Sequence, residues 1–126
     1  MGRIRVLLVE DHRPLANVIR RLLEAECEVV ATVADGFAML GAFRILRPDV
    51  VVADISMPGM DGLTASRWLL QEEPMARIVI ITVHDDPPLM ERAREIGVLG
   101  YVAKLRSGTD LIPAVRSAAK GGLFDV

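Results

Sequence analysis

Three acids, one threonine and one lysine stand at the ends of short apolar segments in this 126-residue chain. Glu10 and Asp11 follow the first such segment, Asp54 and Thr82 are the last residues of two others, and Lys104 follows the final one. An oxygen-rich group of acids without a cysteine and histidine cluster suits a hard cation such as Mg²⁺ better than zinc. If the fold brings these segment ends together, the residue types predict a Mg²⁺ site.

The lysine extends this prediction from a metal ion to a phosphoryl group. An ammonium opposite Mg²⁺ leaves room between the two cations for a dianion, and phosphate fits that description. Asp54 is the carboxylate that can attack phosphorus, while Thr82 and Lys104 stabilise charge on the transferred oxygens. The expected product is an acyl phosphate on Asp54.

Each of these residues has an ordinary explanation when it is considered alone. Acids after strands are commonly helix caps or solvated loop residues, Thr82 suits a strand, and Lys104 suits the surface. Their shared position at segment ends favours the functional interpretation. His12 and His84 have no second ligand in sequence reach, so both are interpreted as solvated loop residues.

The apolar segments are short and nearly continuous, which is typical of strands buried on both faces of a parallel sheet. Strict alternation with amphipathic helical patterns implies right-handed crossovers and helices on both faces. In such sheets the carboxyl ends of the strands form the edge where ligands bind. The predicted strands are Ile4–Val9, Glu28–Val33, Val50–Asp54, Arg77–Thr82 and Gly100–Ala103.

The intervening helices are predicted from apolar residues three and four positions apart. Pro113 falls inside the last of them, where it removes an amide donor. With Thr109 as the N-cap, Pro113 would lie near the first turn, where this loss matters least. The helical patterns cover residues 15–23, 39–46, 63–71, 89–96 and 111–119, and Pro48, Pro74 and Gly97 end the second, third and fourth.

Composition limits the possible classes of protein. The length suits one domain, and 52% hydrophobic with 25% charged residues excludes a disordered tail. No apolar run reaches the roughly 18 to 20 residues that cross a bilayer, so no membrane partner and a cytoplasmic location are expected. A net charge of −2 argues against a nucleic-acid footprint over the whole domain. The single cysteine, Cys27, is expected to be a buried or half-buried, inert thiol.

The sequence resembles the receiver domains of two-component response regulators over nearly its whole length. The acid pair, the central aspartate, the threonine and the lysine occur in the family's order and spacing. The carboxyl-terminal residues 114–122 resemble receivers that precede a LuxR-type helix-turn-helix. The resemblance rests on Val9-Glu10-Asp11-His12, on the block from Arg47 to Gly62, on Thr82 and on Gly100-Tyr101-Val102-Ala103-Lys104.

This resemblance implies a fold and a set of roles. The fold is a flavodoxin-like (βα)5 doubly wound parallel sheet with strand order 2-1-3-4-5, in a single domain spanning residues 1–126. A sensor histidine kinase phosphorylates Asp54. Asp11, Asp54 and the Ser56 backbone carbonyl bind Mg²⁺ directly, and Glu10 acts through water. Thr82 and Lys104 hold the phosphoryl oxygens.

The resemblance also implies a switch. Phosphate draws the Thr82 hydroxyl inward, Tyr101 changes rotamer, and the face made by the fourth helix, fifth strand and fifth helix is remodelled, which makes it a candidate homodimer surface. Such a receiver is not an enzyme beyond its own phosphotransfer and autodephosphorylation. It controls an output, transcription in receivers of this kind, and contacts DNA only through an output domain that these residues do not include. The chain is either excised from a longer regulator or acts alone.

Two positions depart from the commonest family pattern. Leu105 follows Lys104 where the family often has proline, which leaves the geometry of this peptide open. Glu10 replaces the commoner aspartate, a substitution that the family also shows.

Two other functions compete with the receiver. A Mg²⁺-dependent aspartyl-phosphate hydrolase also uses an aspartate nucleophile, but it usually needs a second aspartate where this chain has Ser56. A receiver-like dimerisation or scaffold module that is never phosphorylated would not require the acids, Thr82 and Lys104 to be intact.

Overall fold

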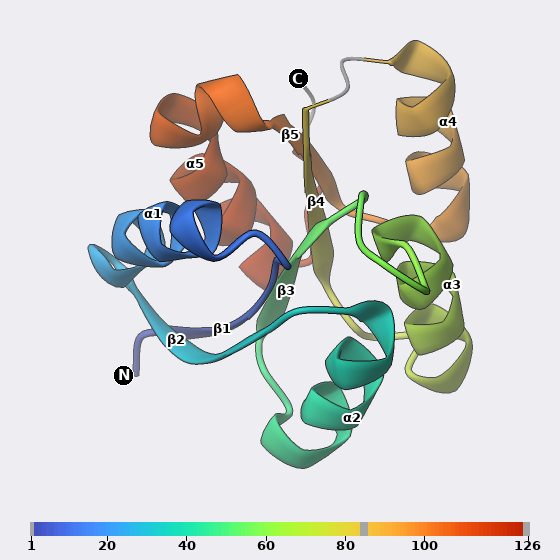
Figure 1. Cartoon of the computed structure of the whole chain (residues 1–126), viewed down its shortest axis with the longest axis horizontal. Helices are drawn as coiled ribbons and strands as arrows, with labels where there is room; N and C mark the ends of the chain where they lie inside the picture. The colour runs from blue at the N-terminus through green and yellow to red at the C-terminus, as the bar shows by residue number, and fades with distance from the viewer. Residues whose placement is uncertain (1, 84–85, 125–126) are drawn as a thin grey trace.

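A computed structural model describes residues 2–83 and 86–124 of the chain. Five parallel strands form one sheet in the order β2-β1-β3-β4-β5, which confirms the predicted strand order. Helices α1 and α5 lie on one face of the sheet and α2, α3 and α4 on the other (Figure 1). The strands are β1 (Ile4–Val9), β2 (Cys27–Val33), β3 (Val50–Asp54), β4 (Ile78–Thr82) and β5 (Gly100–Ala103). The helices are α1 (Arg13–Glu24), α2 (Gly36–Leu46), α3 (Gly62–Glu72), α4 (Pro87–Ile96) and α5 (Ser107–Ala119), with the 3₁₀ turn η1 (Lys104–Arg106) before α5.

The central strands are buried on both faces, as their continuous apolar sequences predict. Every residue of β3 and β4 is buried. Because successive side chains of a strand point to opposite faces, Val51 and Val52 belong to the cores on opposite sides of the sheet. The strand predictions differ from the structure at two ends only, since β2 begins one residue earlier, at Cys27, and β4 one residue later, at Ile78.

Local residues account for where several helices begin and end. Asp35 and Asp61 cap α2 and α3, each accepting a hydrogen bond of 2.8 Å from the amide three residues on. Gly97 ends α4 with a φ of 112°, in the left-handed region that favours glycine. Cys27 is buried, as predicted. Trp68 lies on α3 but is 53% exposed, so it adds little to the core.

The start of α5 corrects one prediction. Thr109 is not its N-cap, because η1 leads directly into a helix that begins at Ser107. The Thr109 hydroxyl instead donates to the Arg106 carbonyl at 3.2 Å. Pro113 therefore lies inside the helix, and its missing amide leaves the carbonyl of the exposed Thr109 without the usual helical donor.

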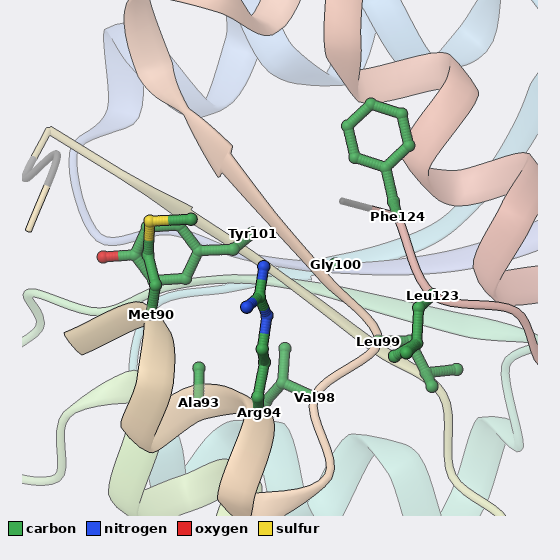
Figure 2. Close-up of a pocket in the computed structure, with 9 residues that line it drawn as sticks. All are labelled: Met90, Ala93, Arg94, Val98, Leu99, Gly100, Tyr101, Leu123 and Phe124. Carbon is green, nitrogen blue, oxygen red and sulfur yellow. The ribbon is translucent and has the colours of Figure 1, made fainter. Parts of the chain in front are cut away.

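The segment after α5 turns back along the edge of the sheet. Phe124 forms a parallel bridge with Gly100, the first residue of β5. Leu123 and Phe124 thereby line one side of a cavity of about 210 Å³, with Met90 and Arg94 of α4 on the other side (Figure 2). His84, predicted to be a solvated loop residue, lies outside the described residues. Among those that are described, no helix has the length and apolar character needed to cross a bilayer.

Replacing Gly41 with alanine is expected to stabilise the domain. Gly41 lies within α2, and a Cβ built there has no heavy atom within 4 Å beyond its chain neighbours and the backbone of the helix itself. Because glycine loses more backbone entropy than alanine on folding, the gain in unfolding free energy should be about 0.5–1 kcal/mol. Urea denaturation of both proteins measures it, and a loss of stability would contradict the open environment at this position.

Candidate phosphoryl-transfer site

The parallel sheet brings the ends of four strands to one edge. In the observed registers Val9 of β1 pairs with Ala53, and Asp54 of β3 pairs with Ile81. Thr82 then pairs with Ala103, the last residue of β5. The predicted polar residues therefore gather at one edge because each of them ends, or directly follows, one of these neighbouring strands.

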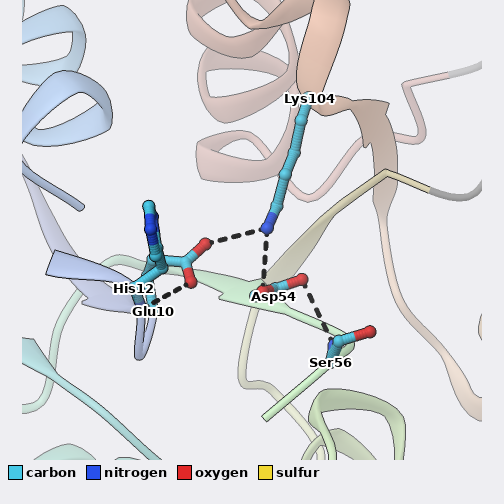
Figure 3. Close-up of polar contacts among 5 residues, drawn as sticks. All are labelled: Glu10, His12, Asp54, Ser56 and Lys104. Atoms are coloured by element: carbon cyan, nitrogen blue, oxygen red, sulfur yellow. Dashed lines mark hydrogen bonds and ion pairs between the residues drawn. The ribbon is translucent and has the colours of Figure 1, made fainter. Parts of the chain in front are cut away.

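At this edge Lys104 joins two buried acids. Its Nζ atom lies 2.9 Å from Asp54 Oδ2 and 3.1 Å from Glu10 Oε1 (Figure 3). Glu10 and Asp54 are each only 3% exposed, whereas Asp11 is exposed. One carboxylate oxygen from each of the three acids lies within 4.8 Å of the others. The structure thus brings together the four charged residues predicted from sequence.

Backbone amides orient the two buried carboxylates. The His12 amide donates to Glu10 Oε2 at 3.0 Å, and the Ser56 amide donates to Asp54 Oδ1 at 3.2 Å. Each carboxylate therefore has one oxygen held by the backbone and the other facing the ammonium of Lys104. These contacts orient both carboxylates toward the lysine.

Burial and charge act in opposite directions on Glu10 and Lys104. Burial raises the pKa of Glu10 above its ordinary value, and the His12 amide and the lysine only partly offset this effect. Burial alone would lower the pKa of Lys104, but hydrogen bonds and charge from Asp54 and Glu10 outweigh it, so its pKa lies above the ordinary value. The lysine is therefore charged at neutral pH.

The donor set at this edge fits a hard divalent cation. Three carboxylates against one ammonium leave two formal negative charges, which a dication cancels. Glu10 Oε1 is buried, and apart from the Lys104 ammonium 3.1 Å away it has no polar partner among the described residues. Oxygen ligands without sulfur or imidazole match Mg²⁺.

The other predicted site residues occupy different surroundings. Ser56 is exposed, two residues beyond the site aspartate. Thr82 is buried at the end of β4, and Tyr101 is buried in β5 beside the cavity shown in Figure 2. Their roles as metal ligand, phosphate ligand and switch remain predictions. The Lys104–Leu105 peptide is trans, since the described chain has no cis peptide bond.

Gly62 supports the site in a way that the sequence did not predict. The Gly62 amide donates to the Ile55 carbonyl at 2.9 Å. A Cβ at Gly62 would lie 2.0 Å from the backbone oxygen of Asp54. The absent side chain therefore lets α3 begin against the backbone of the site aspartate. No local sequence signal reports such a contact between segments.

The strand order and the acidic edge with its lysine define the receiver class of flavodoxin-like domains. Comparison with known proteins agrees, because residues 6–116 match the response regulator receiver domain family. This chain belongs to that family.

Individual relatives agree with this assignment. The chain is 36% identical to the response regulator GacA of Pseudomonas aeruginosa over 94% of its own length, and 32% identical to the transcriptional regulatory protein DegU of Brevibacillus brevis over 98%. It spans about half of these relatives, 56% and 53% respectively. A LuxR-family response regulator from Aurantimonas has a similar structure, with a TM-score of 0.92 and 34% identity over 97% of this chain and 89% of that one.

Mg²⁺ is expected to stabilise the domain through this site. A ligand that binds only the folded state at a hundred times its dissociation constant adds about 2.7 kcal/mol. Replacing Asp11 with asparagine removes one carboxylate and should weaken Mg²⁺ binding by about tenfold or more. Thermal melts over a Mg²⁺ titration measure both effects. Glu95→Gln, an exposed acid on α4, is the control, and equal Mg²⁺ responses in the two variants would argue against this site.

Proposed function

We propose that this domain accepts a phosphoryl group on Asp54 from a sensor histidine kinase in a Mg²⁺-dependent reaction, and that phosphorylation controls an output. The observation that carries the proposal is the position of Asp54. Its carboxylate is buried, is held by the Ser56 amide, and lies 2.9 Å from Lys104 with Glu10 and Asp11 beside it. A structural ion pair does not need two further acids at the same point.

The proposed reaction is an in-line displacement at phosphorus. A carboxylate oxygen of Asp54 forms a bond to phosphorus while the bond from phosphorus to the kinase imidazole nitrogen breaks, and the imidazole keeps the electron pair. The product is an acyl phosphate. Lys104 and the Thr82 hydroxyl stabilise charge on the phosphoryl oxygens. Asp11, Asp54 and the Ser56 carbonyl would hold Mg²⁺, with Glu10 acting through water, and the ion would offset the charge of the phosphoryl group.

The switch follows from the same residues. The phosphoryl group draws Thr82 inward, and Tyr101 on the neighbouring strand changes rotamer. Thr82 pairs with Ala103 of β5, the strand that also carries Tyr101. A movement of Thr82 therefore occurs next to this strand. The face formed by α4, β5 and α5 then changes its partner affinity, and a homodimer through this face is the expected form.

The relatives suggest the wider setting. DegU is named a transcriptional regulatory protein, and a similar solved structure is described as the RcsB–DNA complex, 27% identical to this chain with a TM-score of 0.90. We infer an output domain that binds DNA, with this domain acting on it in the cytoplasm. The activity of the domain is then phosphoacceptance and autodephosphorylation rather than turnover of a substrate.

Phosphorylation by a small donor tests the proposal directly. The protein is incubated with acetyl phosphate and Mg²⁺, and its intact mass is measured. A single phosphoryl adduct is expected with Mg²⁺, and none is expected when EDTA is present from the start of the incubation. The absence of an adduct with any donor would favour a scaffold module, and repeated turnover of phosphoesters would favour a hydrolase.

A further inference from the structure

The residues after α5 form a strap, residues 121–124, which is built into the edge of the sheet. Gly121 has a φ of 77°, and the amides of Gly121 and Gly122 donate to the Ala118 and Ser117 carbonyls at 2.8 and 2.9 Å. This is a helix ending that reverses the chain direction. The strap therefore starts from a defined turn toward β5.

Two further hydrogen bonds hold the strap in place. The Ser117 hydroxyl donates to the Leu123 carbonyl at 3.1 Å, and the Phe124 amide donates to the Leu99 carbonyl at 2.8 Å. Phe124 is partly buried against the core between the sheet and the α1 and α5 face. A Cβ at Gly100 would lie 3.5 Å from Phe124, an ordinary contact distance, so Phe124 packs directly against this part of β5.

The strap covers part of the edge strand β5, which could otherwise pair with another strand. Strand β5 is an edge of the sheet, and the backbone of an edge strand can pair with an extended segment. Phe124 bridges the first of its four residues. Beneath the strap lies the cavity of about 210 Å³, whose lining is mainly apolar. Loss of the strap would expose both the edge and this cavity.

We propose that the strap keeps two copies of this domain from pairing through their β5 edges. A second copy is the partner that fits, because two identical edges can pair about a two-fold axis and join two sheets into one. Backbone pairing supplies hydrogen bonds, and the uncovered apolar cavities of the two copies supply contact area. With the strap in place, a partner strand would meet Phe124 at Gly100 and could reach only the rest of β5.

This device requires no phosphoryl group. It shares with the proposed function only the face made by α4, β5 and α5. The acetyl phosphate test can therefore succeed while this inference fails, and this inference can hold while the acetyl phosphate test fails. The experiment therefore uses the unphosphorylated protein.

Proline at position 124 releases the strap most specifically. Phe124→Pro removes both the ring and the amide that donates to Leu99, whereas the control Leu123→Ala shortens a side chain that is 70% exposed in the same segment. Sedimentation equilibrium should show monomeric wild-type protein and control, and at least about tenfold tighter dimerisation of Phe124→Pro, equivalent to about 1.4 kcal/mol. Far-UV circular dichroism checks that the variant is folded.

A second variant and a second measurement make the test independent of one substitution. Ser117→Ala removes only the hydroxyl bond to Leu123 and should increase dimerisation by a smaller factor. In the wild type, hydrogen exchange should protect the Phe124 amide more than the Leu123 amide, for which the described residues provide no hydrogen bond. Equal dimerisation of all proteins, a dimeric wild type, or an unprotected Phe124 amide would overturn the inference.

Discussion

Replacing Asp54 with asparagine is expected to abolish the phosphoryl adduct formed with acetyl phosphate and Mg²⁺. The side-chain amide has nearly the same shape and can still accept from the Ser56 amide, so the fold should remain intact. It is not a nucleophile toward phosphorus, however, and it supplies no charge to a metal ion. Intact mass measured over the same time course as the wild type gives the result.

Asp61→Asn is the matched control for this prediction. Asp61 is a nearby carboxylate that caps α3, and asparagine caps helices about as well as aspartate. This variant should reach the same adduct level as the wild type. A phosphorylated Asp54→Asn protein would place the acceptor elsewhere and contradict the proposed role, whereas equal loss in both variants would indicate a general defect of the fold.

Replacing Gly62 with alanine is expected to cause the largest loss of stability of any conservative change near the site. The added Cβ would lie 2.0 Å from the Asp54 carbonyl oxygen and 2.8 Å from its carbonyl carbon. Both atoms belong to the backbone of a buried strand, so neither can rotate away. Overpacking in a close-packed interior costs about 1–3 kcal/mol, and the rigidity of this contact places the expected cost at about 3 kcal/mol or more.

Urea denaturation of Gly62→Ala measures this cost. Gly41→Ala is the control, because it makes the same substitution within a helix that has open space and is expected to gain stability. If Gly62→Ala remains folded, its phosphorylation by acetyl phosphate should also be slower, because relief of the clash moves the backbone of Asp54. A stability equal to that of the wild type would show that α3 can shift away from β3 at little cost.

Much of the fold followed from patterns that are local in sequence. Strand β3, Val-Val-Val-Ala-Asp, was predicted with its exact bounds because a strand buried on both faces requires an uninterrupted apolar run. Gly97 predicted the end of α4 because glycine adopts a positive φ without a steric penalty. The prediction of Thr109 as the N-cap of α5 was wrong, because the turn η1 continues directly into a helix that begins at Ser107.

The residues that form the site could also be predicted from the sequence, but their arrangement in space could not. Strand ends of a parallel sheet share an edge, so Glu10, Asp54 and Lys104 were expected to be neighbours. Their spacing along the chain does not reveal that one ammonium joins both buried acids while Asp11 remains exposed. Those facts depend on the registers of three strand pairs and on the path of η1.

The sequence by itself determined the alternation of strands and helices, the residues at the carboxyl edge and the family, because burial periodicity and turn chemistry act over a few neighbouring residues. Only the tertiary structure decided the contact of Gly62 with the Asp54 backbone and the return of Phe124 to Gly100. Such contacts join segments that are distant along the chain. They depend on how all the elements pack together, and no local sequence pattern encodes that packing.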